Sequence, residues 1–500
     1  MWLNGGEHQL KHNLIIYVLN MKKAIIFSFA IAAGLTLTLP LSAAEISLDS
    51  CRNMALRNNK TIRMAEEGIR GAGYEKKSAF AAYLPGIDFT GGYMYNQHQI
   101  ELLSEDAKLP TMSFDPATQT FKYNILTTPD GTPIRDPSSG SLIPTEVAVL
   151  PKEGMQFDTH NVFAGAFTLT QPIFMGGMIK AMNDITKYAE NAAIAMKNNA
   201  VQDVIYGVDQ AYWLVVSLKA KKTLAESFVE LVDSLNYSVS ALFEEGMATR
   251  ADQLTVQVKL NEAKIALTKV NNGLTLSRMA LAQVCGLPVH TEMYLADEDA
   301  EDISAVPAPQ TDNMEDVYSR RADLEILRQG INVLGSREKL AMGMMLPKLA
   351  AVGMYSFSNP NVNHGFEKKF GGGFSVGATL TIPIWHWGQH YNHYRATKAT
   401  TNAQRLLLED MEEKVSLQVS QARFSFDEAI KTFEMTLENM ESADENLRCA
   451  RLGVKEGVLT TDDVIAAQTA WLQAHSEKID AQIGIRLCDV YLSKVLGTLH

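Results

Sequence analysis

Four stretches of the chain alternate apolar residues with small or polar ones. Residues 374–382 and 163–170 alternate without a break. Residues 87–95 and 349–357 carry apolar or small residues at every second position, and Met354 is a weak point on the opposite side of the last stretch. A strand points successive side chains to opposite faces, so each stretch predicts a strand with one apolar face and one small, polar face.

Two much longer stretches have helical periodicity. Neither 173–246 nor 384–457 contains proline, and apolar residues recur at three- and four-residue steps, as at Val201, Val204 and Val208. Each stretch predicts a helix of about 65 residues, which at 1.5 Å per residue is on the order of 100 Å long. A glycine-containing turn follows each one, and second helices are predicted over 251–284 and 463–495.

Short motifs recur in the two halves of the chain at a constant spacing. The spacing is 211 residues (383 − 172 = 211) for three pairs: Pro172 and Pro383, Gly246 and Gly457, Gly286 and Gly497. An earlier pair, Pro85 and Pro347, is 262 residues apart. The first half therefore carries a surplus of 51 residues (262 − 211 = 51), which falls between Tyr95 and His160. We interpret this pattern as an internal duplication.

The duplication predicts the organisation of the chain. The N-terminal extension and signal peptide occupy 1–44, and a linker with an acidic run occupies 289–312. The first repeat, 45–288, contains a helix, a strand pair with a long outer loop over 96–160, and a long helix hairpin. The second repeat, 313–500, contains a helix, a strand pair and a long helix hairpin.

The N-terminal segment resembles a secretory signal. Two lysines after Met21 precede an apolar stretch that ends in small residues, with cleavage predicted after Ala44 and translation predicted to start at Met21. A retained membrane anchor is the alternative. We expect no lipid anchor at Cys51, because that residue follows a polar segment well past the apolar stretch.

Composition excludes several classes of protein. Hydrophobic residues make up 46% of the chain and charged residues 20%, which argues against disorder and against a bundle of membrane helices. The formal net charge of −12 argues against nucleic-acid binding. The four cysteines have no zinc-binding spacing. The histidines His386, His390 and His393 have helical spacing, but the first half has no counterpart, and we predict no metal, no cofactor and no catalytic site.

The strands have a length that suits an outer membrane. Each is near ten residues long, aromatic residues such as Tyr93 and Trp385 lie at the flanks, and the second face is small and polar. Four strands cannot close a barrel, and an open sheet edge is not tolerated in lipid because its backbone groups stay unpaired. If these strands cross a membrane, the protein must be an oligomer.

The whole mature chain resembles the TolC-like outer-membrane efflux protein (OEP) family. Each shared motif is weak alone, but the motifs occur in the family's order in both halves. They are Leu84-Pro85 and Leu346-Pro347 before a strand, Pro172-Ile173-Phe174 and Pro383-Ile384-Trp385 after a strand, the turns Gly246-x-x-Thr249-x-x-Asp252 and Gly457-x-x-Thr460-x-x-Asp463, and the ending Leu496-Gly497-Thr498-Leu499.

The resemblance implies an α+β membrane protein that forms a homotrimer. Three chains of four strands would make a twelve-stranded β-barrel in outer-membrane lipid, continued by a helical tunnel in the periplasm. The chain would be the passive exit duct of a tripartite efflux or type I secretion system and not an enzyme. Its partners would be a periplasmic adaptor and an inner-membrane pump of the RND or ABC class.

The resemblance also assigns roles to the hairpin turns. The adaptor would contact Gly246, Thr249, Gly457 and Thr460, and an acidic ring of Asp463 and Asp252 would form the tunnel aperture. Ala466 stands where the family has a second acid, and Leu459 where a basic gating residue can occur. Carboxylates that repel one another in the ring should have raised pKa values.

Other interpretations of the sequence remain. The turn glycines also suit helix C-caps and the turn threonines suit N-caps, which needs no partner. For the whole chain, the alternative is an extracellular or periplasmic coiled-coil structural or adhesive protein whose sheet never enters a membrane. A porin is a weaker option, because a porin has no need of long helices.

Overall fold

The computed structural model describes residues 45–300 and 313–499, which form two compact units. The predicted signal sequence and the end of the predicted linker lie outside the described residues. Of the described residues, we call those within Met1–Thr61, Val201–Thr311 and Val419–His500 the helical unit, and those within Ile62–Ala200 and Asp312–Gln418 the sheet unit. Each unit draws on both halves of the chain, so this division differs from that into repeats, which stays a prediction.

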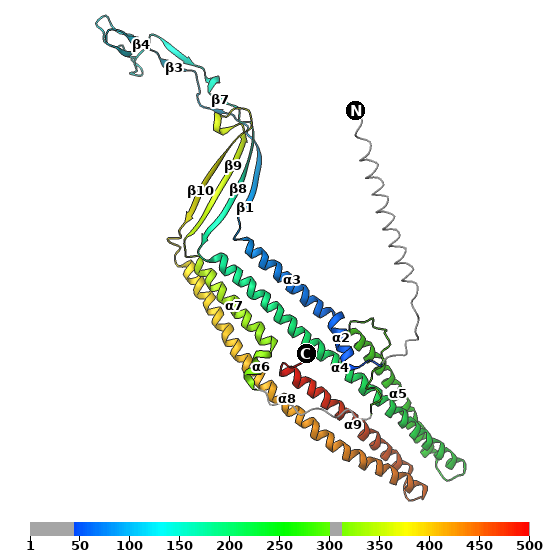
Figure 1. Ribbon diagram of the computed structural model, residues 1–500. Helices are drawn as coiled ribbons and strands as arrows, with labels where there is room; N and C mark the ends of the chain where they lie inside the picture. The colour runs from blue at the N-terminus through cyan, green and yellow to red at the C-terminus, as the bar shows by residue number, and fades with distance from the viewer. Residues whose placement is uncertain (1–44, 301–312, 500) are drawn as a thin grey trace, which may run out of the picture. The chain divides into compact units, whose positions relative to one another are not determined.

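The sheet unit is built on an antiparallel sheet of four strands. They are β1 (Gly86–Tyr95), β8 (Asn161–Met175), β9 (Lys348–Asn359) and β10 (Gly371–Thr381), in that order across the sheet, and Figure 1 shows them side by side. All four predicted strands are confirmed. Among the described residues, β1 pairs with β8 alone and β10 with β9 alone, so both edges of the sheet are open.

The register places the apolar positions of all four strands on one face. Phe89 lies opposite Phe167, which lies opposite Tyr355, which in turn lies opposite Phe374. Aromatic rings meet across the strands, with the centroids of Phe89 and Phe167 4.9 Å apart. The opposite face carries mainly small and hydroxyl residues, together with Met94, Val352 and Met354. In the single chain, the apolar face is exposed.

One close approach on this face explains a glycine within a strand. The ring of Phe357 in β9 lies over Gly165 in β8, and a Cβ at Gly165 would come within 2.6 Å of that ring. A side chain at this position would displace the aromatic ring, so the glycine allows the ring to lie flat against the neighbouring strand.

The repeated prolines mark strand ends, with one correction. Pro85 and Pro347 directly precede β1 and β9, and Pro383 follows β10, as predicted. Pro172, however, does not lie after its strand, because β8 continues to Met175 through an irregularity in register between Pro172 and Phe174. Pairing with β1 has already ended at Thr170, so the missing N–H of Pro172 leaves no bond to β1 unmade.

The surplus segment of the first half contains paired strands and is not a loop without secondary structure. Three two-stranded ladders follow one another, β2 with β7, β3 with β6 and β4 with β5. The elements are β2 (Ile100–Glu101), β3 (Ala107–Pro110), β4 (Met112–Asp115), β5 (Thr120–Tyr123), β6 (Val147–Leu150), the 3-10 turn η1 (Lys152–Met155) and β7 (Gln156–Phe157); a second 3-10 turn, η2 (Val362–His364), lies between β9 and β10. Turn-forming residues separate runs too short for a strand signal in the sequence.

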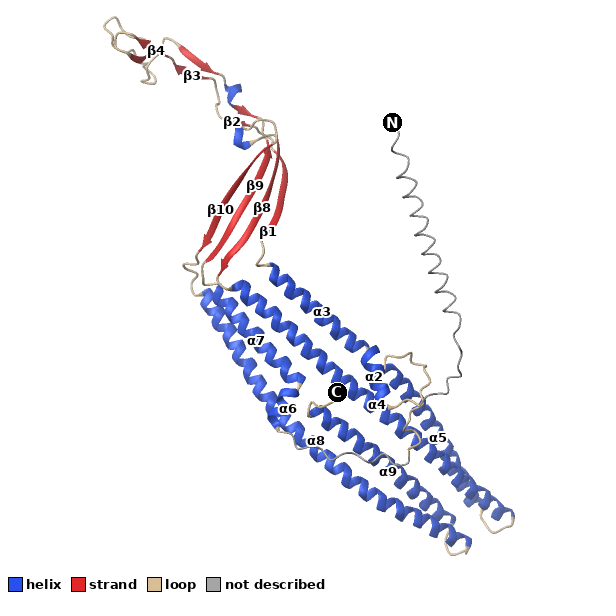
Figure 2. Ribbon diagram, viewed as in Figure 1, coloured by secondary structure: helices blue, strands red, loops and turns tan. Residues whose placement is uncertain are grey.

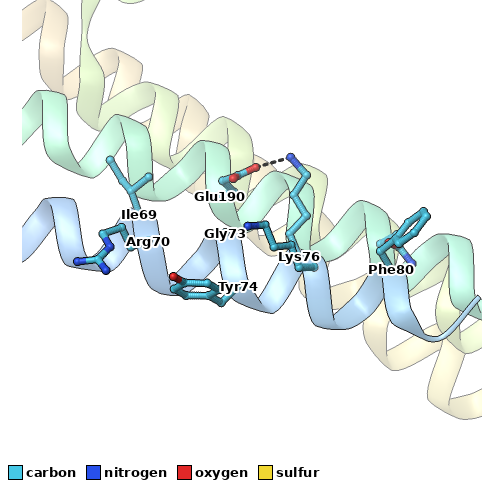
Figure 3. A pocket seen from close by; sticks show the side chains of 9 residues that line it. Ile69, Arg70, Gly73, Tyr74, Lys76, Phe80 and Glu190 are labelled. Atoms are coloured by element: carbon cyan, nitrogen blue, oxygen red, sulfur yellow. Dashed lines mark hydrogen bonds and ion pairs between the residues drawn. The ribbon is translucent and has the colours of Figure 1, made fainter. Parts of the chain in front are cut away.

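Helices complete the sheet unit. They are α3 (Lys60–Ala81), α6 (Met314–Arg320), α7 (Ala322–Gly343) and the first parts of α4 (Met178–Glu244) and α8 (Gln389–Lys455). The side chains of α3 contact α4: Lys76 Nζ lies 2.6 Å from Glu190 Oε2, and Asn183 Nδ2 donates to the carbonyl of Ala79 at 2.9 Å. A groove of about 590 Å³ runs along these helices. Figure 3 shows Lys76 and Glu190, which both line it, paired with each other.

The described part of the helical unit consists of helices and their connections (Figure 2). It contains α2 (Leu48–Asn58), α5 (Arg250–Val284), α9 (Thr461–Val495) and the remaining parts of α4 and α8. The predicted long helices and their returning helices are confirmed, and α4 and α8 have 67 residues each. Within the described ranges, no helix combines the length and apolar character that crossing a membrane requires.

Candidate functional site

The helices α4 and α8, which lead into the two hairpin turns of the helical unit, end in the same way. Gly246 and Gly457 have φ of 77° and 73°, a left-handed conformation that glycine adopts without steric cost. The amide of Met247 donates to the carbonyl of Leu242 at 2.7 Å, and the amide of Val458 to that of Gly453 at 2.8 Å. These six-to-one bonds define a Schellman motif, so the interpretation of both glycines as C-caps is confirmed.

Both returning helices begin with a complete capping box. The Oδ2 atom of Asp252 accepts from the amide and hydroxyl of Thr249 at 2.9 and 2.7 Å. Asp463 accepts in the same way from Thr460 at 2.8 and 2.6 Å. In each box the threonine hydroxyl also accepts from the aspartate amide, at 3.2 and 3.3 Å. The interpretation of both threonines as N-caps is therefore confirmed.

The capping boxes change the expected charge state of the two acids. Hydrogen bonds from the threonine side chain and backbone lower the pKa of both Asp252 and Asp463 below the usual carboxyl value. These directions hold for the single chain, and the rise expected from a ring of like charges in the assembled trimer stays a prediction. The sequence had suggested the motif but not that the same acids close the box.

The two turns differ in the residues that support them. The side chain of Leu459 packs on Gly453, where an added Cβ would come within 2.6 Å of the leucine. In the other hairpin the guanidinium of Arg250 lies over the Phe243 ring, 5.8 Å from its centroid, and donates to Gln253. One turn is therefore supported by an apolar contact and the other by a charged one.

Two apolar clusters lie behind the turns. The first contains Val232, Val239, Val256 and Leu260, and the second contains Leu447, Ala450, Val464 and Ala467. Leu235 of α4 packs against both. Gln468 of α9 donates to the carbonyl of Leu231 at 3.2 Å, which ties the second hairpin to the first.

A groove of about 690 Å³ runs between these hairpins. Its charged lining residues are Glu245, Arg451 and Lys455, and the other residues are mostly apolar or hydroxyl-bearing. Gln468 is 2% exposed, and its Oε1 atom has no hydrogen-bond partner. Sequence reasoning missed Gln468, although an amide one helical turn from Val464 and on the same apolar stripe is a readable signal.

We expect the threonine caps to control local opening of the turns. Thr249→Val and Thr460→Val each remove a hydroxyl that accepts the first-turn amide, at a cost of about 1 kcal/mol. Local opening should therefore rise about fivefold, and trypsin should cleave beside the turns, at Arg250 and Lys455, correspondingly faster. Thr255→Val, at an exposed position within α5, is the matched control. Equal cleavage rates in all variants would contradict a capping role.

The described residues do not assemble a metal site, since no three His, Cys, Asp or Glu side chains among them gather to hold an ion. The rings of His386 and His390 lie 4.6 Å apart between centroids, beside Trp385 and Trp387.

Comparison with known proteins identifies the family. The family model described as outer membrane efflux protein matches residues 138–287 and 314–498. No curated protein matches the sequence. The fold is similar to that of the channel protein CusC (13% identity, TM-score 0.68, covering 91% of this chain and 92% of that one), VceC from Vibrio cholerae (13%, 0.66, 90% and 96%) and the Campylobacter jejuni outer membrane channel CmeC (15%, 0.66, 91% and 86%). Since the family model matches more than half of the chain and includes both hairpin turns, the protein belongs to the TolC-like outer membrane efflux protein family.

Proposed function

We propose that three copies of this chain form an outer-membrane exit duct that passively conducts substrates delivered by an inner-membrane pump through a periplasmic adaptor. The observation that carries this proposal is the sheet, which combines an apolar face exposed in the single chain with two open edges. In water such a face favours aggregation and such edges invite further pairing. Both features suit a sheet that is surrounded by lipid and closed by other copies of itself.

Strand direction supports closure by identical copies. The four strands alternate in direction, so β10 of one copy and β1 of the next would run antiparallel. Three copies would then give a closed barrel of twelve strands with no edge in lipid. The apolar face would point outward, and the small, polar face would line the lumen. The coiled-coil adhesive alternative leaves the apolar face without a partner.

We further propose that the two halves arose from one duplicated unit, with boundaries at 45–288, 289–312 and 313–500. In both halves the order of elements is helix, strand, strand, long helix and returning helix. The repeated glycines share one chemistry, because Gly286 and Gly497 also lie in the left-handed region and end α5 and α9. Pro85, Pro347, Pro172 and Pro383 are the structural residues of this unit.

The hairpin turns are the proposed site of partner contact and gating. In the assembled duct, Asp463 and Asp252 of three copies would form the aperture, and Gly246, Thr249, Gly457 and Thr460 would contact the adaptor. The pump would be of the RND or ABC class, in drug efflux or in type I secretion. Adaptor binding would favour the open population of the hairpins. No cofactor takes part, since the pump supplies the energy.

The aperture proposal predicts an effect on conduction. Asp252→Asn with Asp463→Asn should reduce block by divalent cations and change single-channel conductance in planar bilayers, because up to six charges are removed from one constriction. Asparagine can still accept the capping hydrogen bonds, so the turns should stay folded. Glu262→Gln, at an exposed site on α5, is the control. Unchanged conductance and cation block would place the aperture elsewhere.

The duct itself has a more direct test. Protein extracted from outer membranes should migrate on gels as a heat-modifiable trimer and should conduct ions in planar bilayers. A monomer that is soluble without detergent would contradict the proposed duct and favour the adhesive alternative.

A further inference from the structure

The end of α2 meets the end of α5 within the helical unit. Gly286, with φ of 75°, comes so close to Asn58 that an added Cβ would lie 2.7 Å from its backbone. Beside this contact, Asn59 Nδ2 donates to the carbonyl of Val284 at 2.8 Å. The N-terminal helix is therefore held against the last turn of α5 by contacts that tolerate no added side chain at residue 286.

This contact brings two cysteines together from opposite ends of the first half. Cys51 in α2 and Cys285 at the C-cap of α5 are both 0% exposed. The Sγ atom of Cys285 lies 3.7 Å from the carbonyl oxygen of Cys51, and the two thiols also interact with each other. The other two cysteines differ, because Cys449 is exposed and Cys488 is half-buried.

We propose that Cys51 and Cys285 form a disulfide that fastens the N-terminal helix to the end of the first helix hairpin. The inference rests on the proposed function in one respect: a protein exported to the cell envelope folds where disulfides form and persist. The two thiols lose two protons and two electrons. A protein disulfide of the envelope accepts the electrons by thiol–disulfide exchange and leaves as a dithiol, while one S–S bond forms in this chain.

The burial of the pair sets the order of events. Both thiols are 0% exposed, so a protein disulfide of the envelope cannot reach either sulfur once α2 has packed onto α5. Oxidation therefore precedes the closing of α2 onto α5, and the buried disulfide afterwards resists reductants.

The second half lacks this thiol pair. The repeat spacings place Asn313 (51 + 262 = 313) and Leu496 (285 + 211 = 496) at the corresponding positions. Asn313 instead caps α6, accepting from the amide of Glu315 at 3.3 Å. The proposed disulfide is therefore specific to the first half of the chain and is not a feature that the two repeats share.

Alkylation and mass spectrometry test the proposal on the full-length protein, purified from membranes without reductant. N-ethylmaleimide added in denaturant should label Cys449 and Cys488 and leave Cys51 and Cys285 unlabelled. A tryptic peptide ending at Arg52 should be linked to the peptide that contains Cys285. After reduction in denaturant, all four cysteines should be labelled. Cys51→Ala should expose Cys285 to label without reductant, and Cys285→Ala should expose Cys51.

Two outcomes would overturn the disulfide: full labelling of Cys51 and Cys285 without reductant, or a link from either residue to Cys449 or Cys488. Fractionation of the same cells separates this failure from failure of the proposed function. Outer-membrane protein with free Cys51 and Cys285 refutes the disulfide alone. If the protein is instead found in the cytoplasm, the proposed function fails, and exposure of the reduced protein to oxidised glutathione during refolding decides whether this pair joins.

Discussion

Val376→Lys is expected to abolish most of the trimer in the outer membrane, although Val376 is 79% exposed in the single chain. Val376 lies at the middle of β10 on the apolar face, opposite Gly353. On a surface in contact with water such a substitution changes the free energy of unfolding by no more than about 0.5 kcal/mol. A lysine near the bilayer midplane costs about 2–4 kcal/mol, and a trimer pays this three times. The measurement is the amount of heat-modifiable trimer in purified outer membranes.

Ser375→Lys is the matched control for this substitution. Ser375 is the preceding residue of the same strand, it is also exposed, and its side chain lies on the small, polar face. In the proposed barrel a lysine there would point into the aqueous lumen and should leave the amount of trimer unchanged. Normal assembly of both variants would mean that neither face of the sheet contacts lipid.

Arg52→Met is expected to destabilise the helical unit by about 3 kcal/mol, because it leaves a buried carboxylate without its partner. Arg52 donates from Nε and Nη2 to the two carboxylate oxygens of Asp209 at 2.8 and 2.6 Å. The side chain of Asp209 is 0% exposed and that of Arg52 24% exposed. The loss should appear as a lower urea midpoint of the helical signal in circular dichroism.

The deficit should grow with pH. Burial raises the pKa of Asp209 even with Arg52 beside it, and without the arginine this pKa should rise further. A carboxyl with a raised folded-state pKa stabilises the fold at low pH, and this contribution is lost as pH rises through the folded value. The midpoints of Arg52→Met and wild type should therefore lie closer together at about pH 5 than at about pH 8.

Two variants control for this result. Arg70→Met breaks an exposed pair with Glu67 and should leave the midpoint unchanged, since exposed ion pairs contribute little. Asp209→Asn added to Arg52→Met removes the unpaired charge and should restore part of the loss. A deficit no larger than that of Arg70→Met at every pH would show that the pair does not support the fold.

Much of the fold follows from local pattern. Period-two alternation located all four strands of the sheet, and the absence of proline with helical spacing located α4 and α8, because these signals extend over many residues. The turn glycines and threonines could be predicted as helix caps from their residue types. A residue in the left-handed conformation ends each helix, and a residue with a side-chain hydroxyl begins the next.

Features that depend on distant residues were not predictable. The contact of Cys51 with Cys285 and the pairing of Arg52 with Asp209 join segments more than a hundred residues apart, and no local pattern indicates them. Pro172 was expected after its strand from the shared motif, yet β8 continues to Met175 because it stays paired with β9, whereas its pairing with β1 stops at Thr170. The two-stranded ladders within 96–160 were not predicted, because strands of two to four residues have too few positions to show a period of two.

The contact of Leu235 with the apolar clusters of both hairpins limits how readily the two hairpins can separate. Because this side chain packs against the apolar clusters of both hairpins, one hairpin cannot swing away from the other without exposing it. Exposing a fully buried leucine costs about 1.5–3 kcal/mol, so exposing the half-buried Leu235 costs less than this, and the hydrogen bond from Gln468 to Leu231 must also break. We therefore expect the two hairpins to separate more slowly than they make fluctuations that leave Leu235 covered and the Gln468 hydrogen bond intact.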